Sequence, residues 1–289
     1  MKFNIIYLII LFLFLISCSK DIELNLPEPN KKYVVEGYIE NGCHPVIAIT
    51  RNTSYFDPID SAYLMNLFVL NAKVYISDGD IEAECHLSMD NLLKGVWPYI
   101  YYTTDQIIGE INKIYYIQII IDSDTITGKD TMPNIVCLDS LWCEPIKDND
   151  TLRELWISLT DPPEKNFYRF FTKRLLRDQA YIPSGLFVLD DVYFSNQYFK
   201  VFLMRGFENI YSDSTYRDQE FGKYKIGDTV VVKTANMTRQ HYNFWRTAEQ
   251  EIYIGTSPFI NPVRIKHTVD GGLGVFGCYA TSYDTIIIY

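Results

Sequence analysis

The part of the sequence that best indicates the fold is residues 33–40, Tyr33-Val34-Val35-Glu36-Gly37-Tyr38-Ile39-Glu40. This stretch is rich in β-branched and aromatic residues, which are enriched in strands. Asn41-Gly42 follows at once and is a strong signal for a tight turn. The stretch therefore predicts a β-strand that ends at a turn.

Similar stretches recur at regular spacing as far as Pro133-Asn134, where a domain boundary is expected. In residues 81–87, apolar residues alternate with Glu, Glu and His, which is the period of a half-buried strand. About seven short strands in about 100 residues are typical of an immunoglobulin-like β-sandwich, although the Cys–Trp–Cys spacing of a true immunoglobulin domain is missing. We expect such a sandwich over residues 32–133, with strands at 33–40, 45–50, 67–77, 81–87, 96–104, 113–122 and 125–129.

A second β-rich domain is predicted over residues 134–289. Residues 167–177 fit either a strand or a helix, and the alternation of Arg and Lys with apolar residues favours a long strand. Residues 237–253 lack Gly and Pro, and their larger apolar side chains are spaced three, three and four apart. That spacing predicts one amphipathic helix with one face on a sheet. Further strands are expected at 152–159, 193–204, 229–234 and 285–289.

Composition agrees with a mainly β, globular protein. Of the 289 residues, 48% are hydrophobic and 15% aromatic, which excludes global disorder. The formal net charge is −10, so a phosphate-binding, nucleic-acid-binding surface is not expected.

The N-terminus predicts a lipoprotein signal peptide over residues 1–17. Lys2 precedes an apolar run from Ile5 to Ile16, which as a helix spans about 18 Å and is too short for a bilayer core of roughly 30 Å. Leu15-Ile16-Ser17-Cys18 resembles a bacterial lipobox, so Cys18 is the expected lipidation site; the alternative is an ordinary signal peptide. Residues 18–31 then form a lipidated tether. Lys20 is followed by Asp21 and Glu23, which partly resembles a surface-export signal of bacterial lipoproteins. The expected location is therefore the outer membrane, with a lipid anchor and exposure at the cell surface.

The other cysteines are at positions 43, 85, 137, 143 and 278. Their spacing fits neither a CxxC redox pair nor, with the four His residues, a zinc site. Buried small apolar side chains are therefore the favoured interpretation, and a Cys43–Cys85 bridge is the alternative.

Motifs of enzyme chemistry find little support. Gly272-Leu273-Gly274-Val275-Phe276-Gly277 matches GxGxxG, but strand-like residues follow it where a dinucleotide-binding motif requires a helix. The expected role of Gly271, Gly272, Gly274 and Gly277 is a structural turn, or a bulge that lets a strand pack closely. No HExxH, GxSxG or Walker pattern is present, so we predict no catalytic residues, no metal and no cofactor.

One aromatic cluster is a candidate ligand-binding site. Trp97, Tyr99, Tyr101 and Tyr102 occur within six consecutive positions, and such rings can stack on sugars. The alternative is that they pack in a core.

Several segments together resemble one family. They are the lipobox and tether, Tyr33–Gly37, Asn71-Ala72-Lys73-Val74, the late helix, Asn261-Pro262-Val263 and the closing glycine-rich stretch at 271–277. In this order they resemble the Bacteroidota outer-membrane lipoprotein family of domain of unknown function 4249, over roughly residues 18–289. His267-Thr268 departs from the Ser-Asn pair that the family favours. The resemblance implies an outer-membrane lipoprotein, often encoded beside TonB-dependent receptors, with no established enzymatic activity.

Three functions remain as hypotheses. The first is a non-enzymatic accessory or ligand-binding lipoprotein that partners a TonB-dependent receptor. The second is an independent surface adhesin for a glycan or peptide. The third is a hydrolase, which would require two acids, or a nucleophile and a base, to converge in a pocket.

Overall fold

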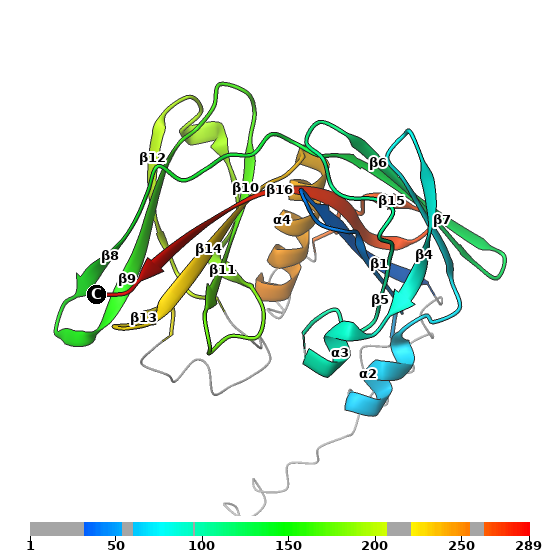
Figure 1. The fold of residues 1–289 in the computed structure, drawn as a ribbon, viewed down its shortest axis with the longest axis horizontal. Helices are drawn as coiled ribbons and strands as arrows, with labels where there is room; N and C mark the ends of the chain where they lie inside the picture. The colour runs from blue at the N-terminus through cyan, green and yellow to red at the C-terminus, as the bar shows by residue number, and fades with distance from the viewer. Residues whose placement is uncertain (1–31, 54–59, 95, 207–220, 255–262) are drawn as a thin grey trace, which may run out of the picture. The chain divides into compact units, whose positions relative to one another are not determined.

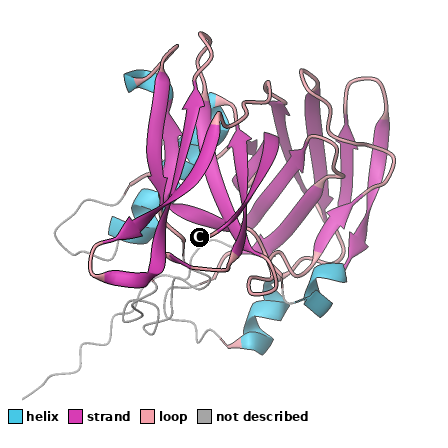
Figure 2. Cartoon of the chain, turned by 60° about the vertical axis from the view of Figure 1, so that its left-hand side comes forward, coloured by secondary structure: helices cyan, strands magenta, loops and turns pink. Residues whose placement is uncertain are grey.

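A computed structural model describes residues 32–53, 60–94, 96–206, 221–254 and 263–289. The signal peptide, the lipidation site Cys18 and the tether expected from the sequence lie outside the described residues. Strands dominate the described residues and helices are few (Figure 2). The prediction of a mainly β, sandwich-like fold is therefore confirmed.

In the described part of the chain, twelve strands form one large sheet in the order β11-β10-β14-β16-β1-β2-β5-β4-β3-β6-β7-β15 (Figure 1). A smaller sheet contains β12-β9-β13, and β8 pairs with β9. The first strands are β1 (Tyr33–Glu40), β2 (Val46–Arg51), β3 (Lys73–Ser77), β4 (Glu82–Ser88), β5 (Tyr101–Thr103), β6 (Ile114–Ile121) and β7 (Asp124–Thr131). The later strands are β8 (Ser140–Ile146), β9 (Asn149–Thr160), β10 (Phe167–Arg174), β11 (Ile182–Asp190), β12 (Tyr198–Leu203), β13 (Tyr224–Lys225), β14 (Thr229–Asn236), β15 (Val269–Asp270) and β16 (Leu273–Ile287).

The predicted amphipathic helix is α4 (Arg239–Ile254), and it packs against β16, β10 and β11 (Figure 1). The sequence did not indicate the short helices α2 (Ser61–Leu67) and α3 (Asp90–Lys94), nor the 3-10 turn η1 (Asp191–Tyr193). Asp60 caps α2 by accepting a hydrogen bond from the backbone of Tyr63. Among the described residues, each helix falls short of the length and apolar character that a membrane span needs.

The last strand, β16, is much longer than the predicted strand at 285–289. It runs parallel to β1, with Gly274 opposite Val35, and antiparallel to β14. Gly271 and Gly272 lie in the turn before β16, as predicted, but Gly274 and Gly277 lie inside the strand. Glycine is uncommon inside strands, so the four glycines at 271–277 did not predict that β16 begins at Leu273. At Gly274 the backbone has φ of 106°, and a Cβ would lie 1.9 Å from the carbonyl oxygen of Val35, so only glycine fits.

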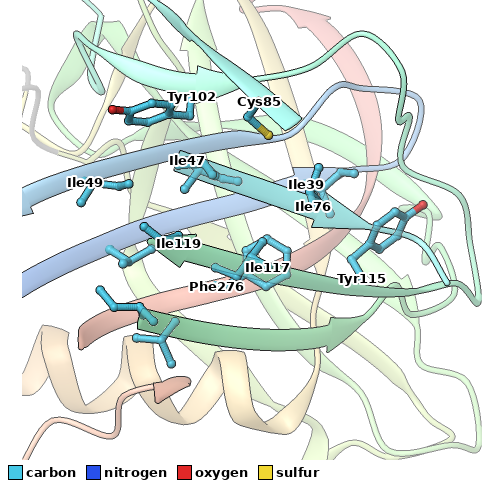
Figure 3. Close-up of a cluster of buried hydrophobic side chains, with 14 of the residues drawn as sticks. Ile39, Ile47, Ile49, Ile76, Cys85, Tyr102, Tyr115, Ile117, Ile119 and Phe276 are labelled. Carbon is cyan, nitrogen blue, oxygen red and sulfur yellow. The ribbon is translucent and has the colours of Figure 1, made fainter. Parts of the chain in front are cut away.

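Among the described residues the buried hydrophobic side chains form three clusters: two large cores, and a smaller cluster between α4 and the strands β10, β11, β14 and β16. Figure 3 shows Ile47, Ile76, Ile117 and Phe276 converging from β2, β3, β6 and β16 in the first core. The second core joins β8, β9 and β12 to β10 and β14, and Ile286 of β16 packs against it. Because β16 contributes to both cores, its position couples the two halves of the large sheet.

The five cysteines among the described residues are free thiols. Cys85, Cys143 and Cys278 are buried, whereas Cys43 and Cys137 are exposed. The alternative of a Cys43–Cys85 bridge is therefore not realised in this structure, and the interpretation as buried small side chains holds for three of the five.

Candidate functional site

A cavity of about 740 Å³ lies over the strands β1, β10, β14 and β16. Its lining includes Tyr38 of β1, Arg169 of β10, Lys233 of β14 and Tyr279 of β16. Helix α4 adds Trp245, and the segments 96–99 and 177–183 complete the wall. Concave sites of this size that combine aromatic rings with a few polar groups are the usual form of small-ligand sites.

The alternation of side chains along β1 places two acids in this cavity. Val35 and Ile39 point into the first core, where they are almost fully buried. Successive side chains of a strand point to opposite faces, so Glu36, Tyr38 and Glu40 face the cavity.

The same rule explains the charges on β10. Tyr168 and Phe170 belong to the second core, whereas Arg169 and Phe171 line the cavity. In the register of the sheet Phe171 lies opposite Lys233 of β14, which brings this second cation to the same face.

Lys233 is held by Glu40. The Lys233 Nζ lies 2.7 Å from Glu40 Oε1, and both side chains are about nine-tenths buried. The hydroxyl of Tyr283 donates to the other Glu40 oxygen at 3.0 Å. Burial together with the neighbouring Glu40 raises the pKa of Tyr283 above its usual range, so this hydroxyl keeps its proton and remains a donor.

Arg169 is held from two sides. Its Nη2 donates to Glu249 Oε1 of α4 at 3.1 Å, and its Nη1 donates to the Tyr279 hydroxyl at 3.2 Å. The guanidinium also lies 3.7 Å from the centroid of the Trp245 ring, a close cation–π contact. Burial raises the pKa of Glu249 and outweighs the opposing effect of Arg169, and burial raises the pKa of Tyr279 to about 12.

Glu36 differs from the other charged groups of the cavity. Its Oε2 accepts a hydrogen bond from the indole N–H of Trp97 at 2.8 Å, and no ion pair joins it to a cation among the described residues. Burial raises the pKa of Glu36, against the smaller opposing effects of the Trp97 hydrogen bond and of Arg169. A partly dehydrated carboxyl group therefore faces the cavity and, among the described residues, forms no ion pair of its own.

The aromatic rings of the cavity divide into two groups. Arg169 lies over Trp245, and Lys233 lies over Phe171 and Tyr181 at 4.4 and 5.1 Å from the ring centroids. The cavity-lining rings that carry no cation among the described residues are Tyr38, Trp97, Tyr99 and Tyr279. Trp97 and Tyr99 meet edge to face with centroids 5.6 Å apart, and 49% of the Trp97 surface is exposed.

His241 of α4 borders the cavity as a neutral structural group. Trp245 donates its indole N–H to His241 Nε2 at 3.0 Å, so the ring proton is on Nδ1, which donates to the carbonyl of Cys278 at 3.3 Å. Burial lowers the pKa of His241 to about 3. Both ring nitrogens are thus engaged, and the ring also packs on Tyr279.

The structure separates the four aromatic residues predicted as a site. Trp97 and Tyr99 line the cavity. Tyr102 is 3% exposed, and its hydroxyl donates to the carbonyl of Val69 and accepts from the backbone N–H of Ala72, so Tyr102 belongs to the core. Tyr101 is half-buried on β5 and does not line the cavity. The alternative of core packing thus holds for Tyr102.

Sequence reasoning missed the charged residues of the cavity. Glu36, Arg169 and Lys233 each interrupt an apolar strand, and that pattern is the signal that was available. A buried ionisable side chain needs a hydrogen-bond or ion-pair partner, so each of these three residues indicated a buried polar site. Their meeting in one cavity depends on the pairing of β1 with β16 and could not be inferred from local pattern.

The structure is therefore that of a β-rich protein with a cavity lined by charged and aromatic side chains. A family model for a domain of unknown function, DUF4249, matches residues 19–285. The chain therefore belongs to the DUF4249 family. A search of curated proteins found no match.

Proposed function

We propose that this chain is a non-enzymatic, lipid-anchored protein of the outer membrane that binds a ligand in the cavity and serves as an accessory partner of a TonB-dependent receptor. The observation that carries the proposal is the cavity of about 740 Å³, with its uncovered aromatic rings and fixed charges. The lipobox at residues 15–18 supports the anchor, because two or three acyl chains attach a protein stably to a membrane.

The arrangement of acids and bases favours binding over catalysis. The cavity lining contains two acids, Glu36 and Glu40, and a glycosidase needs two carboxyl groups that both act on the scissile bond. Glu40 is also committed to Lys233. His241 has both nitrogens in hydrogen bonds, so it offers no free base to a nucleophile.

A second function, an independent adhesin for a glycan or peptide, is favoured by one observation. Trp97 combines 49% exposure with a place at the cavity wall, and such a ring can stack on a sugar or side chain of a surface ligand. Both functions use the cavity as the binding site, but only the first requires a TonB-dependent receptor as a partner.

The test is affinity purification of the tagged full chain from its native host after mild detergent extraction. We expect a β-barrel receptor to co-purify with the wild-type chain and to be lost from the Cys18→Ala variant, which lacks the lipid attachment site. Absence of any barrel protein from the wild-type sample would contradict the accessory role. Binding to a glycan or peptide array without a receptor would then favour the adhesin.

A further inference from the structure

The charges of the cavity do not balance within the protein. Each of the three basic side chains of the lining is paired with a carboxylate at 2.7–3.1 Å: Arg169 with Glu249, Arg177 with Asp228 and Lys233 with Glu40. The remaining acid of the lining, Glu36, belongs to none of these ion pairs. Within the described chain its carboxyl group accepts a hydrogen bond from the neutral indole of Trp97. An entering cation therefore finds an uncompensated carboxylate, whereas an entering anion finds cations already paired.

The rings around Glu36 suit the same kind of ligand. Within the cavity lining, the protein's own cations lie over the rings of Trp245, Phe171 and Tyr181. Trp97, which holds the Glu36 carboxylate, and its neighbour Tyr99 carry no cation among the described residues. An organic cation within about 6 Å of such a ring is attracted by the negative face of the π system, most strongly at Trp.

The cavity is large enough for more than a bare ion. A volume of about 740 Å³ lies within the range of sites for small organic ligands. Among the described residues no group of three or more His, Cys, Asp or Glu side chains is placed to hold a metal ion, so carboxylate and rings together favour an organic cation.

We propose that the cavity binds an organic cation whose ammonium group pairs with Glu36 beside the rings of Trp97 and Tyr99. This inference rests on the proposed binding function and names the chemical class of its ligand. An alkylammonium group has two common sources, the side chain of a lysine peptide and an amino sugar. Both present three N–H donors to a carboxylate and an apolar surface to an aromatic ring.

The experiment is calorimetric titration of the purified full chain in neutral detergent with two matched pairs of probes. Nα-acetyl-lysine amide is compared with its Nε-acetylated, neutral form, and glucosamine is compared with N-acetylglucosamine. We expect at least one cationic probe to bind about tenfold or more tightly than its neutral partner. Which cation binds distinguishes a peptide ligand from an amino sugar.

Two variants place the effect at Glu36. Glu36→Gln retains the oxygen that accepts from Trp97 and removes the charge, so the cationic probe should lose about 10- to 100-fold in affinity. Glu82→Gln makes the same change at an exposed position of β4 and should leave the affinity unchanged. Circular dichroism and thermal unfolding show whether each variant is folded.

Three outcomes would overturn the inference: equal affinity for cationic and neutral probes, no binding of either cationic probe, or a folded Glu36→Gln variant with wild-type affinity. Equal affinity for the cationic and neutral probes would still show ligand binding, so it would not contradict the proposed binding function. Failure of the receptor co-purification would instead overturn the accessory role while leaving the calorimetric result intact.

Discussion

Replacing Gly277 by Ala should destabilise the protein through a single close contact. Gly277 lies in β16 directly beneath His241 of α4. A Cβ built at Gly277 would lie 2.1 Å from His241 Nδ1 and 2.4 Å from Cε1 and Cγ, whereas carbon atoms in contact are ordinarily about 3.5–4.0 Å apart. The ring would have to retreat by more than about 1 Å.

The imidazole cannot retreat freely. Its two nitrogens are hydrogen-bonded to Trp245 and to the carbonyl of Cys278, and its face packs on Tyr279 with centroids 4.4 Å apart. Overpacking of a core costs about 1–3 kcal/mol, and a buried polar group that loses its partner costs about 1–3 kcal/mol. We therefore expect Gly277→Ala to lower the free energy of unfolding by about 3 kcal/mol.

Equilibrium urea denaturation followed by circular dichroism measures this loss. The matched control is Gly79→Ala, where the added methyl meets open space and the only penalty is a backbone φ of 93°. That strain should cost about 1–2 kcal/mol. A second check is the double variant Gly277→Ala/His241→Ala, in which removal of the ring relieves the clash, so the two losses should not add. A Gly277→Ala variant within 0.5 kcal/mol of wild type, a threshold of about the usual scatter for neutral substitutions, would refute the role of this contact.

Three further predictions concern the buried polar groups. Glu249→Gln leaves Arg169 without its carboxylate and should lower the free energy of unfolding by about 3 kcal/mol in urea denaturation, whereas a loss below about 1 kcal/mol would mean that the pair is not buried in solution. In the folded protein the pKa of His241 is lowered to about 3, so between pH 6.5 and 3 only the unfolded chain gains this proton. The free energy of unfolding should therefore fall by up to about 5 kcal/mol over this range. A His241→Gln variant whose stability falls equally steeply with pH would contradict this. Tyr102→Phe removes the hydrogen bonds to Val69 and Ala72 and should cost about 1 kcal/mol of stability with no change in probe affinity, and a selective loss of affinity would return Tyr102 to the binding site.

The spacing of apolar residues was sufficient to predict the helices and strands whose sequence has a clear period. Residues 167–177 were ambiguous between helix and strand, and β10 (Phe167–Arg174) confirms the strand because its two faces meet different environments. The helix predicted at 237–253 is α4 (Arg239–Ile254), whose apolar side packs on the sheet. In both cases burial of one face dictates the period of the sequence.

The start of β16 and the cavity could not be predicted in this way. Glycines at the start of β16 lower its local strand propensity, and they are needed because Gly274 approaches β1 and Gly277 approaches α4. The parallel pairing of β1 with β16 joins segments from opposite ends of the described chain. That long-range pairing brings Glu36 and Glu40 to the same face of the sheet as Arg169, so the composition of the cavity is a property of topology and not of any single segment.

The most direct test of ligand binding in the cavity is the accessibility of Trp97. Acrylamide quenching of tryptophan fluorescence is measured for the wild-type chain and for Trp97→Phe, with and without a saturating concentration of the cationic probe that calorimetry selects. The difference between the two proteins reports on Trp97, which is 49% exposed without ligand. We predict that the probe protects Trp97 from quenching. Calorimetric binding with unchanged quenching of Trp97 would place the ligand elsewhere and contradict the assignment of this cavity.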